Sequence, residues 1–332
     1  MVSFSVKPRP SVAKINQARP ADHAAHGARG FMRIILENSA IHADEVLLVA
    51  WFFVIGAVIG SFLNVVAYRL PKRMSLIEPS SHCPGCKKRI RWRDNVPIIS
   101  WFLLKGRCRD CGSAISVRYP LVEAITAGMF ALLTVAEFTF RGINLPGREI
   151  YKNDGIILFA QNSLHQYGIL LYHLLLLCTL FAAAIIEIDR QRAPWRLFVP
   201  ALFVGIVAPL VWPHLRSMPA WALLPDFVSR IADVAGGLAA GGLLGYIGWR
   251  IGKTESPGGL SWGLLSAGVF LGWQAVCALA LIMMLLTWMA MAFCKLKKNA
   301  KPWPAAVWLY AAALMLILAW SLLGDLTTSL VQ

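Results

Sequence analysis

Charged residues are scarce in this sequence, and acidic residues are the scarcer kind. Asp, Glu, Lys and Arg make up 15% of its 332 residues, whereas hydrophobic residues make up 58%. Because about a quarter of the residues in a soluble domain are charged, this composition excludes an ordinary soluble protein and favours a membrane protein. The 32 basic residues outnumber the 17 acidic ones, but they lie in the gaps between apolar runs, where they act as topology signals. We therefore expect no nucleic-acid partner.

The N-terminal segment lacks the apolar stretch of a secretory signal. Residues 1–31 are polar and contain Pro, Ala and His, without the apolar core that a signal peptide needs. We interpret residues 1–45 as a polar tail. Met32 is a possible translation start, which would leave only a short tail before the first membrane span.

Long apolar runs fill most of the remaining sequence. They cover 46–68, 119–139, 167–187, 197–212, 229–249, 260–294 and 303–324. Since a helix needs about 20 apolar residues to cross a bilayer, most of these runs predict one span each. The run 197–212 is shorter, and 260–294 is too long for one upright span. We expect either one tilted helix there or two short helices broken near Gly272.

Basic residues in the gaps predict the orientation. Eleven Lys or Arg occur from Leu70 to Arg118, against three acidic residues, so this loop is predicted to lie in the cytoplasm. If the run 260–294 crosses twice, the other basic gaps fall on the same side. We therefore predict an all-α polytopic membrane protein of about eight transmembrane segments with both termini outside. The predicted parts after the tail are a first transmembrane helix at 46–69, a cytoplasmic loop at 70–118 and a membrane domain at 119–330.

Four cysteines in this loop predict a structural zinc site. Cys83 and Cys86 form one CxxC pair, and Cys108 and Cys111 form a second pair after twenty-one residues. Two such pairs at this spacing are typical of a zinc knuckle, in which the metal replaces a core that so short a segment cannot build. Two disulfides are the alternative, but thiols stay reduced in the cytoplasm. The remaining cysteines lie singly in apolar runs and are interpreted as packing residues.

Three stretches around these cysteines carry a family resemblance. They read GSFLNVVAYRLP at 60–71, NVPIISW at 95–101 and RYPLVEA at 118–124. Together with the cysteine pairs, they make the sequence similar to the type IV prepilin peptidases, which are bifunctional leader peptidases and N-methyltransferases of type IV pilus and type II secretion systems. The resemblance implies eight spans in the bacterial inner membrane and prepilin or pseudopilin substrates. It also implies S-adenosylmethionine as methyl donor.

The resemblance also implies a peptidase centre made of two aspartates at helix ends. One ionised carboxylate activates water while a second, protonated one polarises the scissile carbonyl, so a single carboxylate cannot play both parts. The stretch IEIDRQRAPW at 186–195 resembles the first family motif and places Asp189 at the catalytic position, with Glu187 as its acidic neighbour. The alternative is that Asp189 is a helix-end carboxylate paired with Arg190 or Arg192.

The second aspartate that the resemblance predicts is absent. The family pattern Gly-x-Gly-Asp should fall near 258–263, counted back from LGWQ at 271–274, and that segment contains no acidic residue. Glu255, in the preceding loop, is the one substitute on the predicted cytoplasmic side. Asp226, Asp233 and Asp325 are predicted to lie near the outer face, about 30 Å away for a helix of roughly 20 residues.

Three functions stay open at this point. The first is an active prepilin-processing enzyme with an unrecognised second carboxylate. The second is a peptidase-inactive methyltransferase, although the sequence contains no Gly-rich turn after a strand that would cradle a nucleotide. The third is a non-catalytic assembly factor whose basic loop docks on a partner or on anionic lipid. The apolar residues of the loop would then form a contact surface, or they close over the metal site and touch the membrane surface. They are Trp92, Val96, Ile98, Ile99, Trp101 and Phe102.

Overall fold

A computed structural model of the protein describes residues 43–78, 81–140, 142, 144, 161–212, 215, 226–252, 258–296 and 303–320. The chain divides into two units, 1–43 and 44–332. The predicted polar tail and Met32 lie outside the described residues, apart from positions 43–45. The description below therefore concerns the described parts of the second unit.

All regular elements of the described residues are helices, as predicted. The long ones are α2 (Ala43–Arg69), α4 (Arg118–Thr134), α5 (Gln161–Ile188), α7 (Asp226–Gly252) and α9 (Trp273–Leu296). The shorter ones are α3 (Ile99–Leu103), α6 (Val199–Val211), α8 (Gly259–Leu271), α10 (Ala305–Leu318), a π-helical turn η2 (Val135–Thr139) and the 3₁₀ turns η1 (Trp92–Asp94) and η4 (Trp195–Leu197). The bridges His82–Arg89 and Arg107–Ala114 are isolated pairs outside any strand.

Five of these helices are long and apolar enough to cross a membrane. They are Ala43–Arg69, Arg118–Thr139, Leu164–Ile188, Phe227–Ile251 and Trp273–Phe293. Three shorter apolar helices occur at Trp195–Val211, Gly259–Leu271 and Ala305–Leu318. The chain is thus a multi-pass membrane protein by length and composition.

The apolar run 260–294 forms two helices, which decides between the two alternatives left by the sequence. Helix α8 ends at Leu271 and α9 begins at Trp273. Gly272 between them has φ +89°, a left-handed conformation that glycine adopts without steric cost. The break near Gly272 is therefore confirmed.

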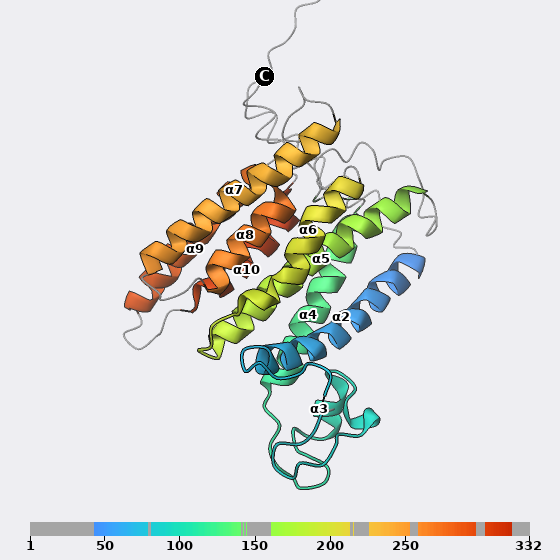
Figure 1. Ribbon diagram of the computed structural model, residues 1–332. Coiled ribbons are helices and arrows are strands. Elements are labelled where there is room, and N and C mark those ends of the chain that lie inside the picture. The colour runs from blue at the N-terminus through green and yellow to red at the C-terminus, as the bar shows by residue number, and fades with distance from the viewer. Residues whose placement is uncertain are drawn as a thin grey trace, which may run out of the picture. The chain divides into compact units, whose positions relative to one another are not determined.

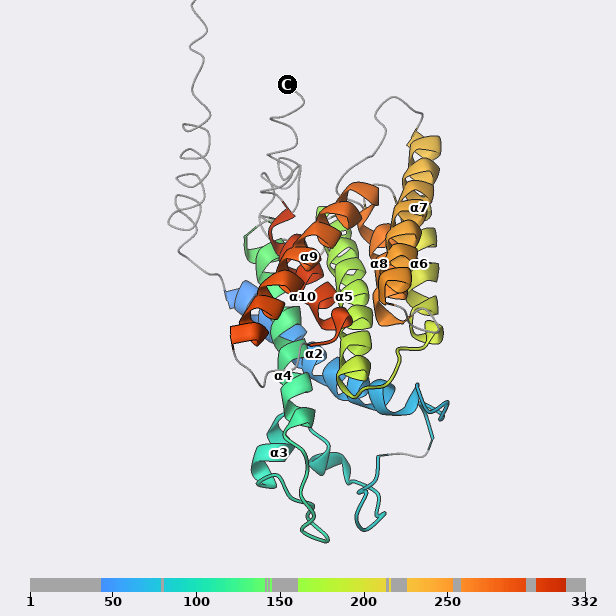
Figure 2. The same ribbon diagram turned by 90° about the vertical axis from the view of Figure 1, so that its left-hand side faces the viewer.

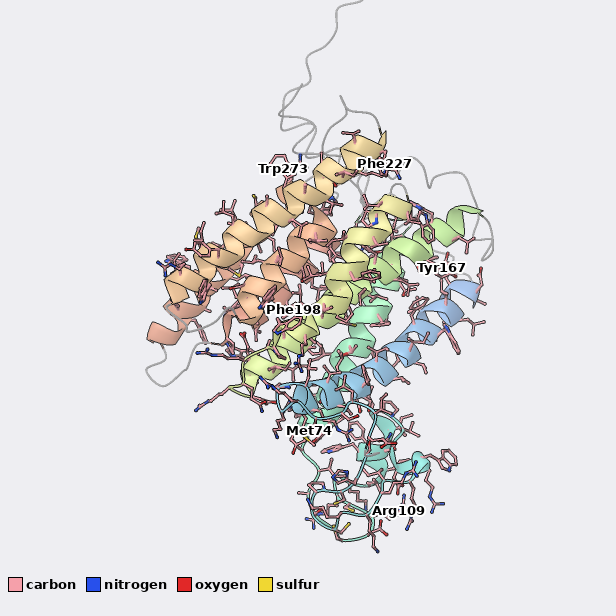
Figure 3. The ribbon with its side chains drawn as sticks, viewed as in Figure 1. Met74, Arg109, Tyr167, Phe198, Phe227 and Trp273 are labelled. Carbon is pink, nitrogen blue, oxygen red and sulfur yellow. The ribbon has the colours of Figure 1, made fainter. Side chains whose placement is uncertain are left out.

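Helix α5 lies at the centre of the helical bundle. Its span is 83% buried, whereas that of α9 is 11% buried. Figures 1 and 2 show α4, α6, α8 and α10 around α5. Phe198, labelled in Figure 3, precedes α6 and is fully buried in the same core. The outer helices expose apolar side chains, which suits contact with lipid rather than water.

Glycines let α7 and α8 approach so closely that their backbones are in contact. A Cβ added to Gly241 would come within 2.5 Å of the Leu264 carbonyl oxygen, and one added to Gly245 within 2.6 Å of the Ser261 oxygen. Small residues at helical spacing allow such contacts between membrane helices. The two helices therefore pack closely as one pair.

Candidate active site and metal centre

The two cysteine pairs form turns with the same backbone pattern. In the first turn, the Cys83 N–H donates to the Lys88 carbonyl and the Lys87 N–H donates to the Cys83 carbonyl, both at 2.9 Å. In the second turn, the Cys108 N–H donates to Ser113 at 2.8 Å and the Gly112 N–H to Cys108 at 2.9 Å. Each turn carries a residue with positive φ, Lys87 at 60° and Gly112 at 70°. The repeated turn brings the two thiols of each pair to the same side.

The four predicted cysteines lie together as one possible metal site. The sulfur atoms of Cys83, Cys86, Cys108 and Cys111 are all within 4.8 Å of one another. The Sγ atoms of Cys83 and Cys111 are 3.7 Å apart, too far for a disulfide bond of about 2.05 Å. Tetrahedral zinc with Zn–S bonds of about 2.3 Å would place two sulfurs roughly 3.8 Å apart. The cluster can therefore hold a metal ion such as zinc.

Ser113 is a member of this site that the sequence analysis missed. Its hydroxyl oxygen lies 3.3 Å from the Cys83 sulfur and 3.1 Å from the Cys111 sulfur. Hydrogen bonding from this hydroxyl lowers the pKa of Cys83 to about 6 and also lowers the pKa of Cys111. Since the thiolate is the form that binds metal, Ser113 favours loading. In the sequence, this role was indicated only by the position of Ser113 two residues after Cys111.

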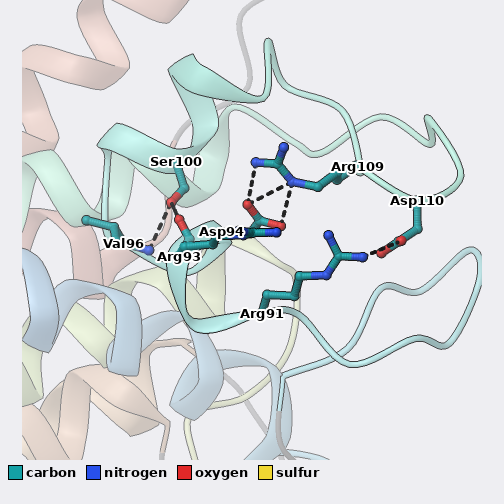
Figure 4. A network of polar contacts seen from close by, with 7 residues as sticks. All are labelled: Arg91, Arg93, Asp94, Val96, Ser100, Arg109 and Asp110. Carbon is teal, nitrogen blue, oxygen red and sulfur yellow. Dashed lines mark hydrogen bonds and ion pairs between the residues drawn. The ribbon is translucent and has the colours of Figure 1, made fainter.

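Two ion pairs brace the loop around the cysteines (Figure 4). The Arg109 guanidinium binds the Asp94 carboxylate through two nitrogens, at 2.6 to 3.0 Å, and Arg91 lies 3.1 Å from Asp110. The hydrogen bond from Arg109 lowers the pKa of Asp94 below its usual value. Both acidic residues of the segment 81–117 are therefore already neutralised by arginines of the same segment.

The apolar residues of the loop separate into two groups. The Trp101 ring lies 3.0 Å from where a Gly106 Cβ would be, and its Nε1 donates to the Ile115 carbonyl at 3.0 Å. In contrast, Trp92 and Phe102 are 84% and 64% exposed. Trp101 therefore belongs to the interior of the loop, whereas Trp92 and Phe102 do not close over the cysteines.

A buried glutamate connects the loop to the membrane helices. Glu123 lies in the second turn of α4 and accepts a 2.7 Å hydrogen bond from the Ile98 N–H of the loop. It also accepts a hydrogen bond from the Ser61 hydroxyl of α2. Asn64 of α2 donates to the Tyr119 carbonyl of α4 at 3.2 Å. Polar contacts thus fix the loop to α2 and α4 at their adjoining ends.

Asp189 pairs with an arginine from a distant part of the chain. Its two carboxylate oxygens lie 2.8 and 2.7 Å from Nη1 of Arg118, the first residue of α4. The structure thus gives Asp189 an arginine partner besides the two sequence neighbours, Arg190 and Arg192, that the sequence analysis considered. A carboxylate shared with one guanidinium nitrogen makes a charge-assisted hydrogen bond. Arg118 lies within a stretch that carries the family resemblance, but the sequence assigned it no role.

Glu187 faces a different direction from Asp189. Its Oε1 accepts the Gly259 N–H at 2.8 Å at the start of α8. The carboxylate also accepts the N–H of Ala306 at the start of α10. Carboxylates stabilise helix N-termini because the N–H groups there lack helical partners. Glu187 therefore joins the ends of three helices.

The start of α8, where the resemblance predicts a second aspartate, instead contacts Glu187 through Gly259. A Cβ at Gly259 would lie 2.7 Å from the Glu187 Oε1 atom, so a larger residue there would displace the glutamate carboxylate. Glu187 lies in the last turn of α5 and Asp189 just after its end, and the two have separate partners. The two predicted site residues thus lie at one end of α5 but are not brought together as a pair.

The other acidic candidates are remote or lie outside the described residues. Glu255 and Asp325 are not described, and of Asp226 only the backbone is. Asp233 is buried in α7, seventeen residues before Arg250 in the same helix, a rise of about 26 Å. Among the described residues, no third carboxylate reaches Glu187 or Asp189.

Sequence reasoning also missed a buried acid–base pair. Nδ1 of His173 in α5 lies 2.9 Å from Oε1 of Glu137 in η2, and the glutamate side chain is fully buried. The other Glu137 oxygen makes no hydrogen bond. The sequence analysis singled out neither residue. The sequence could have indicated this pair through His173, because an ionisable residue within a membrane span often has a functional role.

A multi-pass membrane protein with a four-cysteine loop between its first two long helices is the class that this geometry defines. A model of the Bacterial Peptidase A24 N-terminal domain matches residues 54–137, which cover this loop and its flanking helices. No solved structure matches the chain.

Curated relatives agree over most of the chain. Relatives named prepilin leader peptidase/N-methyltransferase are 31% identical in Klebsiella pneumoniae, with 68% of this chain and 86% of the relative aligned, and 30% identical in Pectobacterium carotovorum, with 78% and 90% aligned. A relative of that name from Myxococcus xanthus is 32% identical over 69% of this chain, which spans only 58% of that protein. The chain belongs to the prepilin leader peptidase/N-methyltransferase family.

Proposed function

We propose that the chain acts on prepilin-type proteins at the end of α5, where Asp189 and Arg118 meet. The observation that carries this proposal is the Arg118–Asp189 ion pair at 2.7 Å, which joins the start of α4 to the end of α5. Asp189 is only partly buried, with a side chain 24% exposed, so a substrate can reach it. The names of the relatives supply the class of substrate.

The carboxylates present favour methyl transfer over peptide cleavage. An aspartic peptidase needs two carboxylates close enough to share a proton. Glu187 is engaged by two backbone N–H groups, so it is not free to share a proton with Asp189. No third carboxylate of the described residues adjoins the two, and Glu255, the one substitute on the predicted cytoplasmic side, lies outside the described residues. Methyl transfer to an amine needs a neutral nitrogen and a single acceptor for its proton. We infer that the chain retains the N-methyltransferase activity of its family and not the peptidase activity.

S-adenosylmethionine enters this proposal as a co-substrate only. The described residues contain no strand followed by a Gly-rich turn, so none of them is assigned to the methyl donor. In the reaction, the amine nitrogen forms the bond to the methyl carbon, the bond between that carbon and the donor sulfur breaks, and the amine releases one proton. The part derived from this chain is the Asp189 carboxylate, which is 24% exposed and paired with Arg118, as the acceptor of that proton.

The proposed arrangement in the membrane follows from charge and helix length. The five long and three short apolar helices would make eight spans, with the loop 70–118 and the end of α5 on the cytoplasmic side of the bacterial inner membrane. Within this loop, Cys83, Cys86, Cys108 and Cys111 would hold one structural zinc ion. The predicted parts 46–69, 70–118 and 119–330 stand as proposals with the same bounds.

The test uses two substrates with the protein in its own membranes. A full-length prepilin reports cleavage, and a pilin that already has its mature N-terminus reports methyl transfer from labelled S-adenosylmethionine. We expect methylation without cleavage, and we expect Asp189→Asn to lose methylation. Cleavage that is lost in Glu187→Gln would overturn the assignment. Absence of both activities would support the alternative of a non-catalytic assembly factor, which the exposed loop surface favours.

A further inference from the structure

Four apolar side chains form an exposed surface on one side of the cysteine loop. They are Trp92, Ile99, Phe102 and Leu103, which are 84%, 57%, 64% and 73% exposed. We call them the α3 surface, since three of them belong to α3. Ser100, on the same short helix, is buried and bonded to the backbone of Arg93 and Val96. The helix therefore has a fixed inner side, and its apolar residues lie on the outside.

The level of α3 along α4 places this surface at the edge of the membrane. The Ile98 N–H, just before α3, donates to Glu123, which lies five residues after Arg118 and thus about 7.5 Å along the helix. Figures 1 and 2 both show α3 in the part of the loop that adjoins the start of α4. Helix α4 is part of a candidate membrane span that contains Glu123. Helix α3 therefore begins at the level of a residue that already belongs to the membrane-spanning segment. Apolar side chains at that depth meet the boundary between headgroups and acyl chains.

The backbone before α3 holds the helix in one direction. Ile98 has φ 63° and ψ −59°, and the Ile99 N–H donates to the Pro97 carbonyl at 2.6 Å. These values define a γ-turn of the strained kind, which persists only where surrounding contacts hold it. Glu123 provides that contact, since its carboxylate accepts the Ile98 N–H. The orientation of the α3 surface is thus fixed from within the membrane domain.

The charges around the α3 surface are positive and lack acidic partners. Asp94 and Asp110 are neutralised by Arg109 and Arg91. The basic side chains left without an acidic partner among the described residues are Lys87, Lys88, Arg89, Arg93, Lys105 and Arg107. Arg93 belongs to η1, next to Trp92, and Lys105 lies two residues after the end of α3. Aromatic and apolar residues flanked by Lys and Arg fit an anionic lipid surface.

We propose that the α3 surface inserts into an anionic lipid leaflet and holds the cysteine loop against the membrane. Phe102 and Leu103 enter the boundary of the acyl chains, while Arg93 and Lys105 bind lipid phosphates. The loop is tethered at both ends by α2 and α4, so the contact needs no further partner. This inference depends on the membrane class of the chain and not on whether it methylates or cleaves a substrate.

The experiment places a genetically encoded fluorescent amino acid at Phe102 of the full-length protein. The protein is reconstituted into nanodiscs of neutral lipid or of neutral lipid with phosphatidylglycerol, each with a nitroxide quencher on the upper acyl chain. The same label at Lys88, an exposed residue of the first cysteine turn, is the control. We expect strong quenching at position 102 in anionic nanodiscs, weaker quenching in neutral ones and little quenching at position 88 in either.

Two results would overturn the proposal. A label at position 102 that stays unquenched in anionic nanodiscs would leave the α3 surface to a protein partner. Equal quenching in neutral and anionic nanodiscs would remove the role of the basic residues. A basic residue near an anionic membrane surface contributes about 1 kcal/mol to binding. Adding Lys105→Gln should therefore lower the ratio of inserted to free loop about fivefold. Retained metal content shows that the labelled loop is folded, and a label at Leu103 repeats the test if Phe102 does not tolerate one.

Discussion

The cysteine loop and the end of α5 differ in how complete their chemistry is. The loop holds four sulfur atoms within 4.8 Å of one another and a hydroxyl, that of Ser113, whose hydrogen bonds lower the pKa of Cys83 and Cys111. At the end of α5, one carboxylate joins backbone groups of α8 and α10, and the other joins Arg118. Among the described residues, four possible metal ligands thus lie together, whereas the two carboxylates have separate partners. This difference underlies our proposal that the chain methylates its substrate without cleaving it.

The largest effect is expected from removing a ligand of the complete site. Cys111→Ala leaves three sulfurs, and because structural zinc contributes about 10 to 16 kcal/mol of apparent binding free energy, the loop should lose both metal and order. Metal content and amide hydrogen exchange of residues 81–117 measure this loss. Cys277→Ser, at an exposed position of α9, is the matched control and should retain the metal. Retained metal in Cys111→Ala would show that the four sulfurs are not the ligand set.

The second prediction concerns the ion pair at the end of α5. Arg118→Ala removes the partner of Asp189, and a lost hydrogen bond between charged groups costs about 1.5 to 3 kcal/mol. We expect methyl transfer to fall on the order of tenfold to a hundredfold, while the metal content of the loop stays unchanged. Arg190→Ala serves as the control, because this exposed arginine next to Asp189 forms none of the ion pairs of the described residues. Equal losses in the two variants would contradict a specific role for Arg118.

A smaller effect is expected from crowding the contact between Glu187 and α8. Gly259→Ala would place a Cβ 2.7 Å from the Glu187 Oε1 atom, and such overpacking costs about 1 to 3 kcal/mol. Denaturant unfolding in detergent measures the change in the free energy of unfolding. Gly128→Ala in α4 is the control, since nothing lies within 4 Å of its added Cβ. A Gly259 variant as stable as the Gly128 variant would show that the contact is not tight.

The smallest effect is expected from Ser113, which lies beside two of the four cysteines. The Ser113 hydroxyl depresses the thiol pKa of Cys83 to about 6, so the thiolate persists as the pH falls through the range in which an ordinary thiol is protonated. In Ser113→Ala this pKa returns towards its ordinary value of 9.0, and protons compete with metal from a higher pH downwards. The midpoint of metal release should therefore move to higher pH, as a pH titration with a zinc indicator would detect. An unchanged midpoint would remove Ser113 from the site.

The sequence predicted the helical fold and the four cysteines because both depend on local patterns. Apolar runs of bilayer length and two CxxC pairs are readable without knowledge of tertiary contacts. The pairing of Asp189 with Arg118 could not be read from local patterns, because the two residues are 71 positions apart in sequence. The contacts of Glu187 with α8 and α10 are long-range for the same reason. Long-range pairs such as Glu137 with His173 carry no local signal beyond burial of an ionisable residue.

Mass spectrometry of a prepilin and of its pre-cleaved form, each incubated with membranes containing this protein, tests the central claim most directly. The account predicts that the pre-cleaved pilin gains one methyl group at its N-terminus while the prepilin keeps its leader. A prepilin that loses its leader, in a reaction abolished by Glu187→Gln and by Asp189→Asn, would show that the two carboxylates form a working pair and would contradict the account.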